Sequence, residues 1–440
     1  MPTNRRNFLK TAALSAAVVT TGVVGAPRVH AAGGDEIRVA LIGCGGRGRG
    51  ACFQALNTEG PVKLVAVADA FEDQAKGFAQ LVKAEKGDRC ALSDDSIFWG
   101  MDSYKKAIDC LNPGDVALLV APPAFRALHF EYAVERGVHI FLEKPFGVDT
   151  PTIKRSLAAW KKAKEKGLKI ITGLNNRKYI RTEETVKRIQ DGAIGDILSC
   201  WVYRLQQHTC GYNYHAEWTP LQNQLRNYNS FTWISGSPTV DWMVHNIDIC
   251  CWAKGEHPIW CQGMGGRQVR DLKDEVFDHI TTEYQFADGV KMLMQVRHLP
   301  NTWTSFRSVI QGSKGMAIVG EGIGEPRIFK GYRDLSDDVV WKSDSPRNDS
   351  YQEEHHRLFR MIREDIPCED VEFCIQSNFI GVMGRMAMES GQELAYDTAW
   401  NSTYELCPNL DNLKFDDPGY IMPNEDGTYT GAKQGFTKRF

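Results

Sequence analysis

Short, almost continuously apolar runs recur between residues 36 and 173, separated by longer stretches of mixed character. A continuous apolar run of about four to eight residues is typical of a strand buried on both faces, as in a parallel sheet. A helical pattern runs through His129 to Glu135 and stops at Gly137. Strands separated by helices predict a doubly wound parallel sheet in an α/β fold. The expected strands are Glu36–Gly43, Val62–Asp69, Val116–Ala121, His139–Glu143 and Leu168–Gly173.

The later part of the chain has strand patterns joined by tight turns. Asp288-Gly289 is a dipeptide typical of a β-hairpin, and Gly315 lies in a second predicted turn. The chain has 440 residues, which is long for one ordinary domain and suits two. The strands expected here are Asp196–Leu205, His279–Phe286, Val290–Arg297, Arg307–Gln311 and Met316–Val319.

The first residues resemble a twin-arginine export signal. Arg5–Arg6 precede Asn7–Lys10, a mild apolar run covers Thr11–Ala26, and Val29–Ala31 offers a small-residue cleavage site. We expect residues 1–32 to be removed after export to the periplasm or another place outside the cytoplasm, which would leave no membrane span. The alternative is an uncleaved anchor. Because this route carries folded proteins, often with a cofactor inside, it favours a tightly bound cofactor.

Composition excludes several classes of protein. An apolar fraction of 42% supports a folded core, and a formal net charge of −3 argues against nucleic acid as a partner. The 12 cysteines include no CxxC pair, and no HExxH motif is present, so no metal site is expected. His355–His356 lies in a charged, helix-like run, where a metal role is the minor alternative.

The first apolar run leads directly into a glycine-rich turn. The segment fits G-x-G-x-x-G at Gly43, Gly45 and Gly48, with Gly46 at a variable position. Such glycines make a tight turn, let the backbone approach a pyrophosphate, and let a helix pack on the strand. The second run ends at Asp69, where a carboxylate accepts hydrogen bonds from the adenosine ribose of NAD. Capping of the next helix is the alternative role. These features predict a Rossmann domain that binds NAD, while Arg47, within reach of a phosphate, leaves NADP open.

Other polar residues follow the later strands at the carboxyl edge of the predicted sheet, where ligands bind. They include Pro122 after one strand, Glu143 and Lys144 after the next, and Asn175 after the last. Three motifs occur in the order and spacing of a known family. They are Ala121-Pro122-Pro123 with His129, then Glu143-Lys144-Pro145, and later Asp241-Trp-Met-Val-His245-Asn-Ile-Asp248. In these motifs the chain resembles the glucose–fructose oxidoreductase and inositol dehydrogenase (Gfo/Idh/MocA) family over nearly its whole mature length.

The resemblance implies a C-terminal α/β domain with an open, mainly antiparallel sheet, often used for oligomerisation. We therefore expect a homodimer or homotetramer. The expected division is a signal at 1–32, a Rossmann domain at 33–175, a substrate and oligomerisation domain at 176–405 whose late helices pack back on the Rossmann domain, and a tail at 406–440. The sequence departs from the family at Ala121-Pro122-Pro123 and at Ser235–Thr239, which affects the nicotinamide contacts and the substrate more than the class.

Alcohol oxidation needs a proton acceptor and a cation beside the reacting oxygen. Asp241, His245 and Asp248 have the i, i+4, i+7 spacing of one helix face among apolar neighbours. We predict that His245 accepts the proton and that Asp241 fixes and charges it; a purely internal Asp–His pair is the alternative. By resemblance, Lys144 links nicotinamide to substrate, against a surface lysine as the alternative, and Glu143 shapes the nicotinamide pocket.

A stretch rich in aromatic and amide side chains suits a sugar, with an aromatic core or subunit interface as the alternative. It contains Trp201, Tyr203, Tyr212, Tyr214, Trp218, Gln222, Asn223, Arg226, Tyr228 and Trp233. The predicted catalytic residues are Lys144, Asp241 and His245. The predicted cofactor ligands are Gly43, Gly45, Gly46, Arg47, Gly48, Asp69, Pro122, His129, Glu143, Lys144 and Asn175. The predicted substrate ligands are Arg177, Trp218 and Asp248.

The sequence therefore predicts an exported oxidoreductase that transfers hydride between bound NAD and a hydroxyl of a sugar, polyol or glycoside. One alternative is an NAD-dependent glycosidase that oxidises, eliminates and re-reduces without net redox change. It gains weight from the export signal, because no NAD pool is expected outside the cytoplasm. Another is a catalytically dead sugar-binding protein, against which the complete set of Lys144, Asp241 and His245 speaks.

Overall fold

The first sheet of this computed structural model is parallel throughout, as the buried apolar runs predict. The structure describes residues 36–207, 213–270, 273–320 and 325–440, so the predicted export signal lies outside the described residues. In these residues the sheet has six strands in the order β3-β2-β1-β4-β5-β6. They are β1 Ile37–Ile42, β2 Val62–Asp69, β3 Ile97–Trp99, β4 Val116–Leu119, β5 His139–Leu142 and β6 Ile170–Thr172. Sequence reasoning missed only β3, which is too short for a recognisable pattern.

Helices cover both faces of this sheet, because successive strand residues point to opposite faces. Ala40, Ala117 and Ile140 belong to one core cluster with α3, α4 and α5, while Val39 and Leu118 belong to another with α1 and α2. The helices are α1 Gly46–Leu56, α2 Glu72–Glu85, α3 Ser103–Asp109, α4 Arg126–Arg136 and α5 Thr150–Glu165. The predicted stop at Gly137 is confirmed, since this residue ends α4 with φ 72°.

The second sheet is mixed and mostly antiparallel. Among the described residues it has nine strands in the order β14-β13-β12-β11-β7-β10-β9-β8-β15, in which β10 and β7 pair in parallel. The predicted hairpin is confirmed as the antiparallel pair β9–β10. The strands are β7 Ile197–Gln206, β8 Trp260–Gly266, β9 His279–Gln285, β10 Lys291–His298, β11 Ser305–Gly312, β12 Gly315–Val319, β13 Arg327–Phe329, β14 Val339–Lys342 and β15 Leu394–Ala395.

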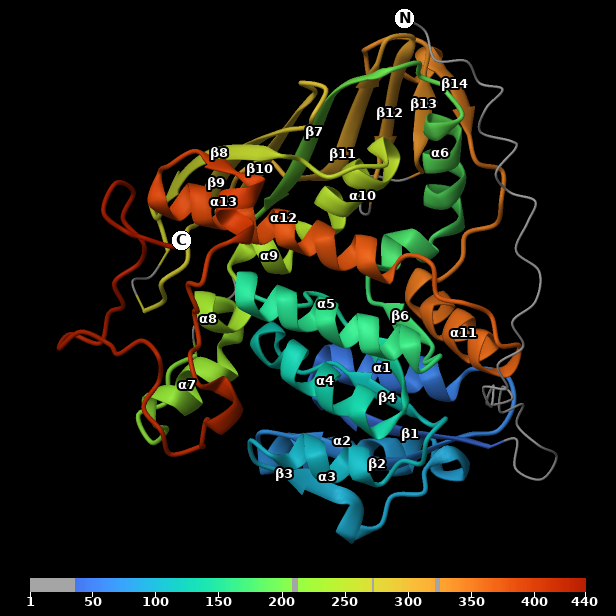
Figure 1. Cartoon of the computed structure of the whole chain (residues 1–440), viewed down its shortest axis with the longest axis vertical. Coiled ribbons are helices and arrows are strands. Elements are labelled where there is room, and N and C mark those ends of the chain that lie inside the picture. Colours follow the sequence, from blue (N-terminus) through green and yellow to red (C-terminus); the bar gives the residue numbers. More distant parts are fainter. Residues whose placement is uncertain (1–35, 208–212, 271–272, 321–324) are drawn as a thin grey trace, which may run out of the picture. The chain divides into compact units, whose positions relative to one another are not determined.

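Helix α12 lies between the two sheets (Figure 1). This helix, the longest of those described, packs on β8 and on α5, and its Asn378 Oδ1 accepts a hydrogen bond from the Gly147 N–H at 3.2 Å. Helix α11 packs on α1, so late helices do contact the first domain. None of the described helices combines the length and apolar character needed to cross a membrane. The remaining helices are α6 Ile180–Gln190, α7 Pro220–Arg226, α8 Thr232–Ser235, α9 Pro238–Asp241, α10 Val244–Lys254, α11 Ser350–Arg363, α12 Val371–Ser390 and α13 Tyr396–Trp400.

A small third core joins the predicted tail to the rest of the chain. Leu406 and Leu410 from the tail pack in one cluster with Phe125 from the Rossmann domain and with Leu225 and Trp233 from α7 and α8. Figure 1 shows the red tail beside α7. The tail is therefore folded against both α7 and the Rossmann domain.

Candidate active site

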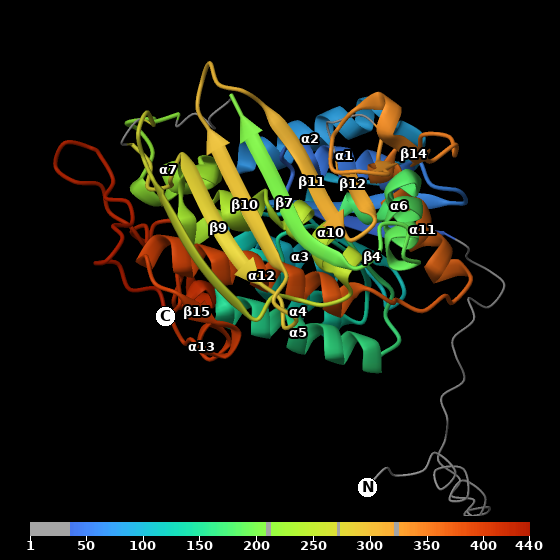
Figure 2. The same cartoon turned by 90° about the horizontal axis from the view of Figure 1, so that it is seen from above.

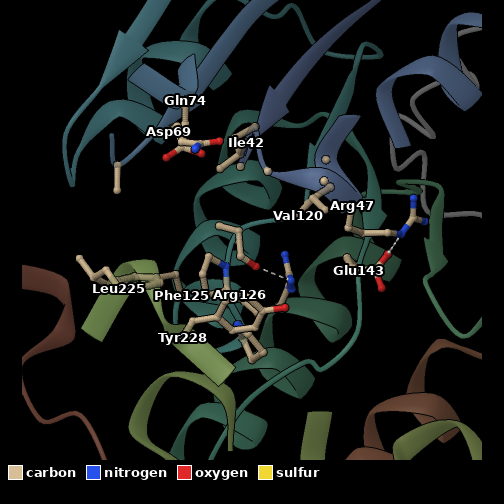
Figure 3. Close-up of a pocket in the computed structure, with 18 of the residues that line it drawn as sticks. Ile42, Arg47, Asp69, Gln74, Val120, Phe125, Arg126, Glu143, Leu225 and Tyr228 are labelled. Atoms are coloured by element: carbon tan, nitrogen blue, oxygen red, sulfur yellow. Dashed lines mark hydrogen bonds and ion pairs between the residues drawn. The ribbon is translucent and has the colours of Figure 1, made fainter. Parts of the chain in front are cut away.

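A cavity of about 830 Å³ lies at the carboxyl ends of the parallel strands. One wall comes from the residues that follow β1, β2, β4 and β5, and the other from β7, α7 and the region of α9 and α10. In Figure 3, Asp69 and Gln74 belong to the first wall, and Leu225 and Tyr228 to the second. A ligand in this cavity would touch both domains.

The glycine-rich turn has the shape that a dinucleotide needs. Gly43 has φ +99°, and a Cβ there would lie 2.6 Å from the Ala121 nitrogen. A Cβ on Gly48 would lie 1.8 Å from the Gly43 oxygen, so only glycine allows α1 to pack this closely. Gly45 and Gly46 face open space in the cavity wall. The turn therefore fits a pyrophosphate, with backbone of α1's first turn exposed to it.

Asp69 lies at the end of β2 and lines the cavity. Its two oxygens accept hydrogen bonds from the backbone N–H groups of Cys44 at 2.8 Å and Phe71 at 3.0 Å. Burial raises the pKa of this carboxyl, and the two backbone donors oppose that effect. The residue at the N-cap of α2 is Phe71, so Asp69 is not the cap. Its place fits the adenosine ribose of NAD.

Arg47 lines the cavity, but its guanidinium has other partners than the predicted phosphate. Nε donates to Glu143 Oε2 at 2.9 Å (Figure 3). Nη2 donates to Glu354 Oε2 at 3.2 Å. Burial raises the pKa of Glu354 well above its usual value, which Arg47 opposes. Gly173 makes room for this cluster, since a Cβ there would lie 2.7 Å from Glu143 Oε2. Glu143 is thus held beside the cavity by Arg47.

Lys144 and Asp241 meet across the two domains. The Lys144 ammonium donates to Asp241 Oδ1 at 3.1 Å and to the Asp241 backbone oxygen at 2.6 Å. The side chains are 18% and 7% exposed, so this lysine is not a surface residue. A partly buried ion pair lining the cavity holds the ammonium in place.

His245 lies beside this pair, but it is not charged by Asp241. Asp241 ends α9, and His245 is the second residue of α10, so the two are not on one continuous helix as predicted. Asp241 pairs with Lys144, while His245 Nδ1 has no partner among the described residues. Burial, followed by the charges of Lys144 and Arg204, lowers the pKa of His245 well below its usual value. His245 is therefore a neutral imidazole, able to accept a proton.

Arg177 and Asp248 do not reach the cavity, against the prediction that they bind substrate. Arg177 Nε and Nη2 donate to the Asp248 oxygens at 2.6 and 2.9 Å, and both residues are buried. The guanidinium also lies over the rings of Trp252 at 4.8 Å and Phe373 at 5.1 Å. Asp248 lies on α10 with His245, but its carboxylate is occupied by Arg177, outside the cavity lining.

Of the other predicted cofactor ligands, some line the cavity and some do not. Asn175 lies outside the cavity lining, and its Nδ2 donates to Ser350 Oγ at 3.1 Å. Pro122 and His129 line the cavity. The His129 ring lies 4.2 Å from that of Tyr104, and burial lowers its pKa to about 3. His129 is thus a neutral part of the wall.

The aromatic stretch serves several purposes. Trp218, Arg226 and Tyr228 line the cavity, and the Trp218 ring stacks on His215 at 3.9 Å. Trp233 is fully buried in the third core, so for this residue the core alternative holds. The remaining members include Trp201, which is 36% exposed, and Tyr212, which lies outside the described residues.

Sequence reasoning missed Arg126 and Arg204, which both line the cavity. Buried Arg126 donates to the backbone oxygens of Leu119, of Ala121 at 2.6 Å and of Pro145 at 3.3 Å, and burial lowers its pKa to about 10. It joins the segments that carry Pro122 and Lys144. The sequence signal that could have identified Arg126 is its place in the first turn of the helix that follows a strand's carboxyl end. The described residues contain no cluster of three or more His, Cys, Asp or Glu side chains suited to a metal.

Known proteins match both parts of the chain. A family model described as an oxidoreductase family with an NAD-binding Rossmann fold matches residues 37–174, and the GFO/IDH/MocA C-terminal domain matches residues 183–318. The chain is 23% identical over 288 residues to scyllo-inositol 2-dehydrogenase (NAD(+)) of Bacillus subtilis (strain 168), covering 65% of this chain and 74% of that protein.

Two solved structures share the fold. Aldose-aldose oxidoreductase from Caulobacter crescentus, complexed with glycerol, matches with a TM-score of 0.64 and 15% identity. Levoglucosan dehydrogenase, in complex with NADH and levoglucosan, matches with a TM-score of 0.62 and 20% identity. Each match covers 82% of this chain and 99% of the other. Because both family models describe domains of one family, in the order and places that the motifs predict, the chain belongs to the Gfo/Idh/MocA family of NAD-binding oxidoreductases.

Proposed function

We propose that the protein transfers hydride between NAD and a hydroxyl-bearing carbon of a sugar or polyol. The observation that carries the proposal is one continuous cavity, lined at one end by Asp69 and the glycine-rich turn and at the other by Lys144, Asp241 and His245. Bound NAD supplies the carbon that accepts or returns the hydride. The family matches support the class of reaction, and the named relatives act on inositol, aldose and levoglucosan.

His245 and Lys144 divide the work on the substrate oxygen. A neutral imidazole lining the cavity accepts the proton that leaves the hydroxyl, and it returns that proton in the reverse reaction. The Lys144 ammonium donates to the same oxygen and stabilises the negative charge that develops there. Asp241 is a positioning residue, because it accepts two hydrogen bonds from the ammonium and so fixes its place.

The second wall of the cavity suits a hydroxylated ring. Trp218, Tyr228 and Trp242 line the cavity with aromatic side chains, and Gln206 and Asn229 line it with amides. Aromatic faces pack on the C–H face of a sugar, while amides exchange hydrogen bonds with its hydroxyl groups. This combination favours a neutral sugar, polyol or glycoside as substrate.

The predicted export signal motivates the proposal that NAD stays bound through many turnovers. A cofactor that exchanged freely would be diluted away after twin-arginine export to the periplasm. The hydride would then return within the same site, to a second substrate or to an intermediate of the first. NAD is favoured over NADP, since a second negative charge beside the Asp69 carboxylate is repelled.

The test uses protein purified after export and dialysed without nucleotide. The retained dinucleotide is identified by mass spectrometry, and sugars and polyols are added while the absorbance of reduced nicotinamide is recorded. We expect one of them to reduce the bound cofactor and a second to reoxidise it. Failure of every sugar and polyol to change the redox state would contradict the proposal. Cleavage of a chromogenic glycoside without an added acceptor would favour the glycosidase alternative.

We also propose that copies of the chain pair through the outer face of the nine-stranded sheet. Leu293, Trp201 and Val309 are register neighbours across β10, β7 and β11, and they form an apolar row that is at least partly exposed. Figure 2 shows these strands in front of α10 and α12, which cover the other face. Light scattering should give a dimer or tetramer that Trp201→Glu weakens, and a monomeric wild type would contradict this.

A further inference from the structure

An arginine from the C-terminal domain lies over the adenosine end of the cavity. Arg226, the last residue of α7, lines the cavity together with Asp69 and Phe71. Its two terminal nitrogens donate to the Asp73 carboxylate at 2.6 and 3.1 Å. The guanidinium lies 3.9 Å from the centre of the Phe71 ring and 4.6 Å from that of Trp218. It therefore bridges the first turn of α2 to the second wall.

This bridge is stronger than an ordinary surface ion pair. Asp73 is 60% exposed, but the Arg226 side chain is only 22% exposed because aromatic rings cover it. A bidentate carboxylate pair combined with ring contacts fixes the guanidinium plane, whereas exposed pairs contribute little. The same contact lowers the pKa of Asp73, mainly through its hydrogen bonds to Arg226.

The tail supports the bridge from behind. The ring of Phe415 meets Phe71 edge-on, with ring centres 5.2 Å apart. The tail is held to the Rossmann domain by the Leu406 N–H, which donates to Asp149 Oδ2 at 2.8 Å, and by an ion pair between Arg155 and Asp411 at 2.9 Å. Phe71 is therefore clasped between Arg226 and the tail.

We infer that Arg226 is a positioning residue that closes the adenosine end of the dinucleotide site and limits the rate at which the dinucleotide leaves. Adenosine bound at Asp69 lies next to the span from Arg226 to Asp73, so its departure requires this span to open. The inference rests on the proposed retention of NAD, and it assigns that retention to a contact between the two domains. Affinity differences of this kind appear mainly in the dissociation rate.

The test measures dissociation of NADH, followed by its fluorescence during a chase with excess NAD, and it needs no sugar substrate. Arg226→Gln should speed dissociation by about tenfold or more, since it loses both charged hydrogen bonds. Asp73→Asn should act in the same direction, and the double variant should add little to Arg226→Gln. Lys76→Gln is the matched control, because Lys76 lies on the same helix as Asp73, pairs with Glu72 and lies over Trp99 of β3 without lining the cavity.

A second probe separates closure from loss of folding. Nicotinamide mononucleotide lacks the adenosine half, so its affinity should be the same in wild type and Arg226→Gln. Equal NADH dissociation rates in wild type and Arg226→Gln, or an equal loss of mononucleotide and dinucleotide binding, would overturn the inference. NADH could also dissociate quickly from the wild type and still faster from Arg226→Gln. That result would contradict the proposed retention of NAD while leaving the closing role of Arg226 intact.

Discussion

The two walls of the cavity are built on different principles. The Rossmann wall depends on backbone geometry: Gly43, Gly48 and Asp69 act through a turn, a close approach and a strand end. The C-terminal wall depends on side chains of short helices and loops, such as Trp218 and Arg226, which meet the first domain only through tertiary contacts. The first wall therefore depends on local sequence, and the second on contacts between distant parts of the chain.

The largest expected effect concerns the residues at which the walls meet. Lys144→Ala and His245→Ala should each lower kcat by about 10²–10⁴-fold, because a positioned proton acceptor or charged donor is lost. The measurement is turnover of the substrate found in the screen above, with circular dichroism to show that the fold is kept.

Asp241→Asn tests the corrected pairing. Since Asp241 holds Lys144 and not His245, this variant should resemble Lys144→Ala and leave the acid limb of the pH–rate profile in place. That limb should lie well below the usual histidine range, because burial lowers the pKa of His245. An acid limb that moves in Asp241→Asn would restore the Asp–His pairing expected from the spacing.

The second largest effect should appear in stability. Asp248→Asn leaves Arg177 buried without its main partner, which should cost about 3 kcal/mol of unfolding free energy, while kcat changes little. Urea unfolding and turnover measured on the same sample check both parts. The double variant Arg177→Met with Asp248→Leu is the control, since an apolar pair should recover most of the loss. A fall in kcat/KM at normal stability would instead support the substrate role predicted from the motif.

These contrasts show where sequence reasoning succeeds. Gly48 and Lys144 could be predicted because a backbone constraint, or a place directly after a buried strand, dictates the residue type. Asp241 and His245 were wrongly paired because α9 ends at Asp241 and α10 begins at Val244, and Asp248 was misplaced because its partner Arg177 is 71 residues away. Arg226 stood in the aromatic stretch, but its partner Asp73 is 153 residues away, and no local pattern predicts such a pairing.

The next effect is the loss of folding stability at acid pH that is caused by His129 in the Rossmann wall. Burial lowers the pKa of His129 to about 3, so the folded state keeps this ring neutral while the unfolded chain protonates it below about pH 6.5. Its contribution to stability is therefore complete above pH 6.5 and is lost as the pH falls toward 3. In His129→Gln, the difference in unfolding free energy between pH 6.5 and pH 5 should shrink by about 2 kcal/mol.

Urea titrations at the two pH values measure this difference. His355→Gln should act in the same direction, because burial also lowers the pKa of His355. An unchanged pH dependence in both variants would show that other groups dominate acid unfolding.

The smallest expected effect tests the division of labour between the walls at the adenosine end. Asp69→Ala removes a ribose acceptor and a negative charge, so NAD should bind about tenfold more weakly and NADP relatively better. Calorimetry on the apoprotein with both dinucleotides measures the two affinities. Lys76→Gln again serves as the control on the neighbouring helix. We expect the Rossmann wall to set which dinucleotide binds and the C-terminal wall to set how long it stays bound. Asp69→Ala should then change the ratio of the NAD and NADP affinities. Arg226→Gln should instead change the dissociation rates of both dinucleotides and leave that ratio nearly constant. A shift of the ratio in Arg226→Gln as large as in Asp69→Ala would show that both walls read the ribose, and the comparison between them would fail at this end of the site.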